Sequence, residues 1–127
     1  MKYYTRKLIK PGDLNPRNTL FGGALLRWID EEVGIHAMSV LDTKDVVTKF
    51  ISEIDFVESA RQGDIIEIGI EFKKLGNTSI TFSCEVRNIM SKEVIIKIED
   101  IVFVKVDSSD KPTPHGKSMD DIKRVLE

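Results

Sequence analysis

The chain has 127 residues, of which 41% are hydrophobic and 31% charged, a mixture that predicts one globular domain and excludes a disordered chain. Its formal net charge of -2 predicts no general affinity for nucleic acid or an anionic membrane, although a local basic patch stays compatible with it. The single cysteine, Cys84, excludes an internal disulfide, and without a membrane-spanning run or a signal-peptide core we expect a cytoplasmic protein.

The first part of the chain predicts a short strand followed by one long helix. Residues 3–9 favour a strand that ends at the turn signal Pro11-Gly12, and residues 13–19 are rich in turn formers. The apolar segment 24–41 has good helix formers and helical length. Because this helix is apolar over most of its circumference, we expect a curved sheet or a partner to cover it.

The remainder predicts four consecutive strands and a polar tail, residues 108–127, that contains a possible short helix from Ser118. The polar pair Glu99-Asp100 interrupts the last strand as a β-bulge would. Consecutive hairpins indicate an antiparallel sheet, one face of which the helix covers, and its free edges favour dimerisation. The predicted strands are residues 46–58, 66–72, 80–86 and 93–106.

One stripe of the predicted helix combines small residues with a carboxylate. A carboxylate desolvated among small residues gains basicity, which makes Asp30 a candidate general base. The alternative is that Asp30-Glu31-Glu32 is the solvent-facing side of the helix. At 100° per residue, the stripe consists of Gly23, Arg27, Asp30, Gly34 and Ala37.

Gly22-Gly23 opens the same helix, where the first amides lack intrahelical partners and the helix dipole is positive. These amides are candidates for an oxyanion hole, and the alternative is a plain tight turn. Asn15, in the preceding loop, offers an amide to a water or carbonyl, or else forms an Asx turn. His36 is interpreted as a packed histidine, and His115 has no partner at metal-ligand spacing.

The segment Asn15 to Asp30, NPRNTLFGGALLRWID, resembles the signature of hot-dog-fold acyl-CoA thioesterases of the cytosolic acyl-CoA hydrolase branch. That signature has a loop Asn, a Phe-Gly-Gly that opens the central helix, and an Asp eight residues after the first Gly. Two positions depart from it and bear on substrate preference, since Glu31-Glu32 replaces small or apolar residues and Asn77 stands where Thr is commoner. The resemblance extends over almost the whole chain, through Phe56-Val57, Gly63-Asp64, residues 74–79 and residues 106–112.

The resemblance implies an α+β hot-dog fold, in which a five-stranded antiparallel sheet wraps the long helix and two copies pair into one continuous sheet. It implies a homodimer, a hexamer built as a trimer of dimers, and hydrolysis of acyl-CoA without metal or prosthetic group. Asp30 would be the general base or the attacking carboxylate, Gly22 or Gly23 would polarise the thioester carbonyl, and Asn15 would hold the water or carbonyl. The implied contacts to coenzyme A are Lys74, Asn77, Thr78 and Ser79.

The spacing of Gly22 and Asp30 adds a geometric prediction. Eight residues of helix separate them by about 12 Å, whereas groups acting on one carbonyl must lie within roughly 3 to 4 Å of the reacting atoms. We therefore expect a site shared by two subunits with antiparallel helices. Two alternatives on the same fold are a non-catalytic acyl-CoA-binding or regulatory module and a dehydratase, for which His36 offers no catalytic motif.

Overall fold

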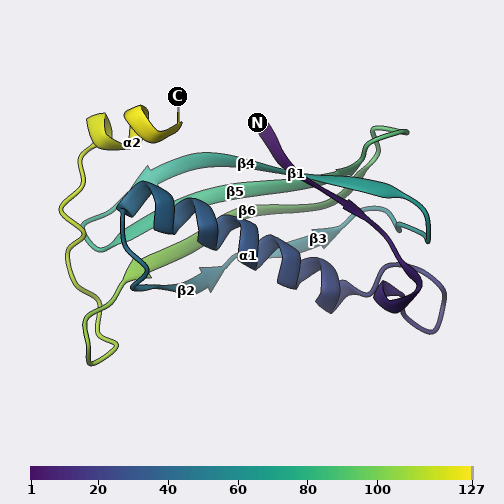
Figure 1. Cartoon of the computed structure of the whole chain (residues 1–127), viewed down its shortest axis with the longest axis horizontal. Coiled ribbons are helices and arrows are strands. Elements are labelled where there is room, and N and C mark those ends of the chain that lie inside the picture. The colour runs from purple at the N-terminus through teal and green to yellow at the C-terminus, as the bar shows by residue number, and fades with distance from the viewer. Residues whose placement is uncertain (127) are drawn as a thin grey trace.

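One long helix, α1 (Gly22–Leu41), lies against a six-stranded antiparallel sheet in the computed structural model, which describes residues 1–126 (Figure 1). The strands are hydrogen-bonded in the order β1-β4-β5-β6-β2, and β3 also pairs with β6. The strands are β1 (Lys2–Leu8), β2 (Val46–Ile51), β3 (Ile54–Phe56), β4 (Ile65–Leu75), β5 (Ser79–Asn88) and β6 (Val94–Lys105), and the smaller helices are a 3-10 turn (Pro11–Asp13) and α2 (Met119–Leu126).

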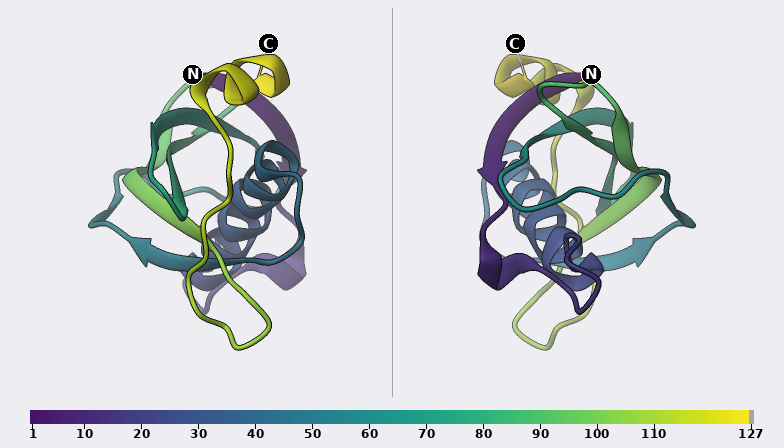
Figure 2. Two further views of the ribbon diagram at one scale, coloured as in Figure 1. Left: turned by 90° about the vertical axis from the view of Figure 1, so that its left-hand side faces the viewer. Right: turned by 90° about the vertical axis from the view of Figure 1, so that its right-hand side faces the viewer.

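The helix α1 buries an apolar row in the hollow of the sheet, which curves around it in the views along its length (Figure 2). Leu25, Ile29, Val33 and Ala37 recur every four residues and are at most 2% exposed, so they form one face of the helix. The helix ends at Leu41, and the left-handed backbone of the next residue, Asp42, brings the Thr43 N–H to the Met38 carbonyl at 3.1 Å. Within residues 1–126, no helix is long and apolar enough to cross a membrane.

The prediction of one strand over residues 46–58 is wrong, because this segment forms two strands, β2 and β3. The sheet therefore has six strands instead of the predicted five. The predicted bulge explains the division. Glu99 and Asp100 of β6 lie opposite Ser83 alone in β5, which confirms the bulge. At the same level Ser52 donates its N–H to the Asp100 carbonyl at 2.8 Å, and its hydroxyl accepts from the Asp100 N–H at 3.0 Å. A side chain thus replaces a regular ladder partner, and the strand is interrupted there.

The edge strand β2 exposes a row of large apolar side chains. Val47, Phe50 and Ile51 are 44%, 54% and 36% exposed, and no strand of residues 1–126 pairs with the outer side of β2. Phe56 and Val57 continue the exposed apolar surface at about half exposure. An apolar sheet edge of this kind is typical of a surface that another chain covers.

The tail ends in α2, which begins directly after Ser118, where the sequence predicted a short helix. Ser118 and Asp121 cap each other reciprocally, since the Ser118 N–H donates to Asp121 Oδ2 at 2.8 Å and the Asp121 N–H donates to Ser118 Oγ at 3.4 Å. These hydrogen bonds lower the pKa of Asp121, and the bond from the Ser118 backbone N–H has the largest effect. Ile122 anchors the helix on the core at 1% exposure.

Candidate functional site

A cavity of about 300 Å³ opens at the beginning of α1 and brings two predicted site residues together. Asn15 from the loop and Gly22 from the first turn of the helix both line it, opposite Phe56 and the segment that follows β3. The helix begins after Phe21, whose backbone is extended. In the part of the chain that the structure describes, no side chain caps this helix start by a hydrogen bond. Gly22 therefore lines this cavity at a helix start that has no capping side chain, and the first amides of a helix lack intrahelical partners, as an oxyanion site requires.

The two glycines at this helix start differ in their surroundings. A Cβ on Gly22 would lie 3.5 Å from the ring of Phe56, which is an ordinary contact distance. A Cβ on Gly23 would lie 3.2 Å from the ring of Phe21, so Gly23 has less room for a side chain. Gly22 lines the cavity and Gly23 is exposed beside it. Gly22 is therefore the better placed of the two for contact with a bound carbonyl.

Asn15 organises the loop that leads into the helix. Its Oδ1 accepts hydrogen bonds from the N–H groups of Arg17 at 2.9 Å and Thr19 at 3.2 Å, and its Nδ2 donates to Thr19 Oγ1 at 2.9 Å. This is the Asx-turn arrangement that the sequence left open as an alternative. A side-chain amide has two N–H donors, so one donor of Asn15 is left for a ligand or a water.

Asp30 lies in the middle of α1 and is exposed in the single chain. Its Oδ1 accepts a hydrogen bond of 2.7 Å from the hydroxyl of Thr48, which projects from the edge strand β2. The neighbouring Glu31 is also exposed and pairs with Arg27 at 3.0 Å. In one chain, then, this face of the helix is solvent-exposed, and the carboxylate of Asp30 points toward the open edge of the sheet.

Thr48 is a partner of the candidate residue Asp30 that the sequence analysis missed. It is one of two polar residues in the apolar strand β2, and it follows Asp30 by 18 positions. Only the packing of α1 beside β2 brings the two together. An odd polar residue in an apolar edge strand was the signal available in the sequence.

The residues predicted to contact coenzyme A lie at the β4–β5 turn, at the end of the molecule where α1 finishes (Figure 1). Asn77 is exposed there, and Thr78 and Ser79 are half-buried. Lys74 faces a cavity of about 490 Å³ that is lined by residues of the sheet, among them Phe50 of the edge strand. The single chain therefore separates three groups: Asn15 with Gly22, Asp30 with Thr48, and the β4–β5 turn.

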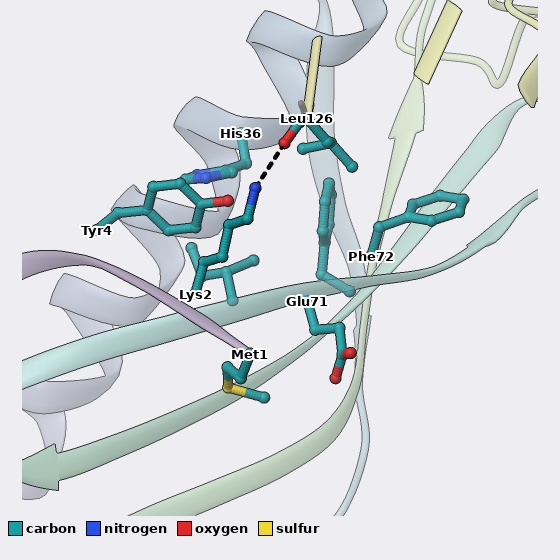
Figure 3. A pocket seen from close by; sticks show the side chains of 9 residues that line it. Met1, Lys2, Tyr4, His36, Glu71, Phe72 and Leu126 are labelled. Carbon is teal, nitrogen blue, oxygen red and sulfur yellow. Dashed lines mark hydrogen bonds between the residues drawn. The ribbon is translucent and has the colours of Figure 1, made fainter. Parts of the chain in front are cut away.

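A further cavity of about 280 Å³ lies between β1, α1 and α2 (Figure 3). The His36 ring packs edge-on against Tyr4 with the ring centres 4.3 Å apart, and its Nδ1 donates to the Glu32 carbonyl at 3.1 Å. Lys2 Nζ closes one side by donating to the Leu126 carbonyl at 3.0 Å. His36 thus has the surroundings of a packed histidine, as the sequence indicated.

Cys84 lies in the core between α1 and the sheet at 2% exposure. Burial, followed by the charges of Glu85 and Glu32, raises the pKa of its thiol to about 12. The thiol is therefore protonated at neutral pH, and Cys84 is a small core residue instead of a nucleophile.

Residues 17–95 match the family model of the thioesterase superfamily, a range that includes the end of the loop, the helix α1, the strands β2 to β5 and the first residues of β6. The chain belongs to the thioesterase superfamily. This superfamily member is 30% identical over 107 residues to YkhA of Bacillus subtilis, an uncharacterized acyl-CoA thioester hydrolase, with 82% of this chain covered. The chain spans 62% of the length of that relative.

Solved structures of the superfamily establish the fold. A hexameric hotdog fold thioesterase of Campylobacter jejuni is 25% identical, with a TM-score of 0.77 over 97% of this chain and 95% of that one. An acyl-CoA hydrolase from Staphylococcus aureus, solved in complex with butyryl coenzyme A and coenzyme A, is 27% identical, with a TM-score of 0.76 over 89% and 67% of the two chains. The predicted α+β hot-dog fold is confirmed, with the additional strand described above.

Proposed function

We propose that the protein is an acyl-CoA thioesterase that hydrolyses an acyl-CoA to a free carboxylic acid and coenzyme A. Membership of the thioesterase superfamily supports this reaction class, and so do the acyl-CoA hydrolase names of its relatives. The observation that carries the proposal is the position of Asp30. Its carboxylate accepts a hydrogen bond from Thr48 at an open apolar sheet edge, and Gly22, at the start of the same helix, lines a cavity. No metal or prosthetic group takes part in the reaction as proposed.

The site is completed by a second copy of the chain that pairs along β2. Gly22 and Asp30 are about 12 Å apart along α1, so one helix supplies only one of them to a given thioester. In this dimer, a second copy related by a two-fold axis beside β2 covers the exposed side chains of Val47, Phe50 and Ile51. The same axis places the two α1 helices antiparallel. Gly22 of one subunit then faces Asp30 of the partner subunit. We propose this homodimer as the unit of a hexamer, the assembly named for the Campylobacter jejuni relative.

Each group has a defined part in the reaction. The first-turn amides at Gly22 donate to the thioester oxygen, and the free Nδ2 donor of Asn15 holds that oxygen or the water. Asp30 of the partner subunit accepts a proton from the water, whose oxygen bonds to the thioester carbon. The carbon–sulfur bond then breaks, and the coenzyme A thiolate leaves and takes the proton. As an attacking carboxylate, Asp30 would instead form a mixed anhydride, which water then hydrolyses.

Coenzyme A is proposed to lie along the β4–β5 turn, through contacts with Lys74, Asn77, Thr78 and Ser79. In one chain this turn is at the opposite end of the molecule from Gly22 (Figure 1). The two-fold axis reverses that direction, so the turn of the partner subunit lies at the same end as Gly22. The bound molecule would therefore contact both subunits.

The test is a thiol-release assay with a panel of acyl-CoA substrates on the native protein, Asp30→Asn and Glu31→Gln. Asp30→Asn keeps the shape and removes the base, so kcat should fall by at least about 100-fold. Glu31→Gln is the matched control, since it removes the adjacent exposed carboxylate and should keep kcat within about twofold of native. A native protein that binds acyl-CoA without releasing thiol would instead be a binding module. A folded Asp30→Asn variant that keeps more than a tenth of kcat would contradict the assignment of Asp30.

A further inference from the structure

The buried imidazole of His115 lies directly beneath the β4–β5 turn. His115 belongs to the tail, 36 residues after Ser79, and is 8% exposed. Its Nε2 is 2.6 Å from the Gly76 carbonyl and 3.2 Å from the Ser79 carbonyl, and its Nδ1 is 3.0 Å from the Lys117 N–H. Carbonyls only accept and the Lys117 N–H only donates, so Nε2 carries the proton and Nδ1 is the acceptor. One imidazole ring thus links the turn to the tail.

The tail and the adjoining end of β6 together hold all four carbonyls of the turn. The carbonyls of Gly76 and Ser79 accept from the His115 ring, and the Asn77 carbonyl accepts from the His115 N–H at 3.2 Å. The Thr78 carbonyl accepts from the Lys105 N–H at 2.9 Å. The side chains of Asn77 and Thr78 form the tip of the turn, where they were predicted to contact coenzyme A.

The β4–β5 ladder reaches the turn at the pair Leu75 and Ile80. Within the turn itself, the structure of residues 1–126 shows one closing backbone bond, from the Gly76 N–H to the Ser79 carbonyl at 2.9 Å. The Ser79 hydroxyl occupies the space that a Cβ on Gly76 would need, so a larger residue there would require that hydroxyl to rotate away. The Ser79 carbonyl is shared between this closing bond and the His115 ring, and loss of the imidazole would leave the Gly76 carbonyl without its donor.

We propose that His115 is a positioning residue that holds the β4–β5 turn in the shape that binds coenzyme A, a role that rests on the proposed function. It touches neither the thioester nor the reacting atoms. Its loss should weaken binding of the coenzyme A part of the substrate and leave the chemical step unchanged. Loss of His115 should therefore raise KM for acyl-CoA. It should not change the hydrolysis of a thioester that lacks most of coenzyme A.

The experiment compares native protein, His115→Phe, His115→Gln and the control Ser109→Ala, which changes an exposed serine of the same tail. His115→Phe keeps an aromatic ring without donor or acceptor, and His115→Gln restores a donor to the turn. We expect KM for acyl-CoA to rise about tenfold in His115→Phe and less in His115→Gln, with kcat within about twofold. Hydrolysis of the matching acyl-N-acetylcysteamine thioester should not change in either variant, and Ser109→Ala should behave as native.

Two further measurements keep the inference separable from folding and from the proposed function. Hydrogen exchange of the turn amides, residues 76–79, should accelerate in His115→Phe below its melting temperature, while exchange in α1 stays as in native protein. If the native protein hydrolyses no thioester, the proposed function fails, and a coenzyme A titration then tests the inference alone, with about tenfold weaker binding expected in His115→Phe. An unchanged KM in folded His115→Phe, or an equal loss on both thioesters, would overturn the role of His115.

Discussion

Replacement of Thr48 by valine tests how the structure holds the carboxylate of Asp30. Valine keeps the shape and the β-branch of threonine in strand β2 but removes the hydroxyl that donates to Asp30 Oδ1 at 2.7 Å. A hydrogen bond to a carboxylate contributes about 1.5 to 3 kcal/mol where water is excluded, as it would be under a second subunit. Since each 1.36 kcal/mol changes a rate tenfold, kcat should fall by about 10- to 100-fold in Thr48→Val.

The assay is steady-state thiol release from a single acyl-CoA, with kcat and KM determined separately. Thr48→Ser is the matched control, because serine keeps the hydroxyl, and it should retain kcat within about threefold of native. KM should change little in either variant, since Thr48 acts on Asp30 and not on coenzyme A. Equal kcat values for Thr48→Val and Thr48→Ser in folded dimers would show that the bond to Asp30 has no part in positioning the carboxylate.

Three other predictions concern the helix start, the core and the outer face of the sheet. Gly22→Val crowds the first-turn amides and should lower kcat/KM by about 100-fold in the thiol-release assay, whereas Gly12→Ala, with open space around it, should have no effect. Cys84, with its pKa raised to about 12, should resist a thiol reagent at pH 8 in native protein and react on denaturation; rapid native labelling would contradict its burial. Arg87→Ala removes the hydrogen-bonded partner of Glu67, which is 5% exposed, and leaves it with Arg6 at 3.9 Å, so the midpoint of unfolding in urea should fall; an unchanged midpoint would contradict this.

Local patterns in the sequence were sufficient for most of the fold. The length and composition of residues 24–41 predicted a helix, and period-2 alternation predicted the strands of the sheet. Even the bulge was visible, since Glu99-Asp100 breaks that alternation in β6. Each of these features is determined by neighbours within a few residues along the chain, which is why a single sequence contains enough information to predict it.

The features that were missed depend on contacts between distant segments. The break between β2 and β3 arises because Ser52 bonds to Asp100, which lies 48 residues further along the chain. Thr48 reaches Asp30 only because α1 packs beside the edge strand, and His115 reaches the turn across more than 30 residues. No periodicity in the sequence encodes such pairs. Asp30 is a further case, because its proposed surroundings include a second chain.

The central claim is that Gly22 and Asp30 act on one thioester from two subunits, and a mixed dimer tests it most directly. A chain with Asp30→Asn paired with a chain with Gly22→Val contains one site with both native groups and one site with neither. Random pairing of equal amounts makes about half of the dimers mixed, so co-expression should restore roughly a quarter of native activity from two nearly inactive parents. Native mass spectrometry would confirm that mixed dimers are present. Activity no higher than the mean of the two parents in such a sample would contradict the shared site.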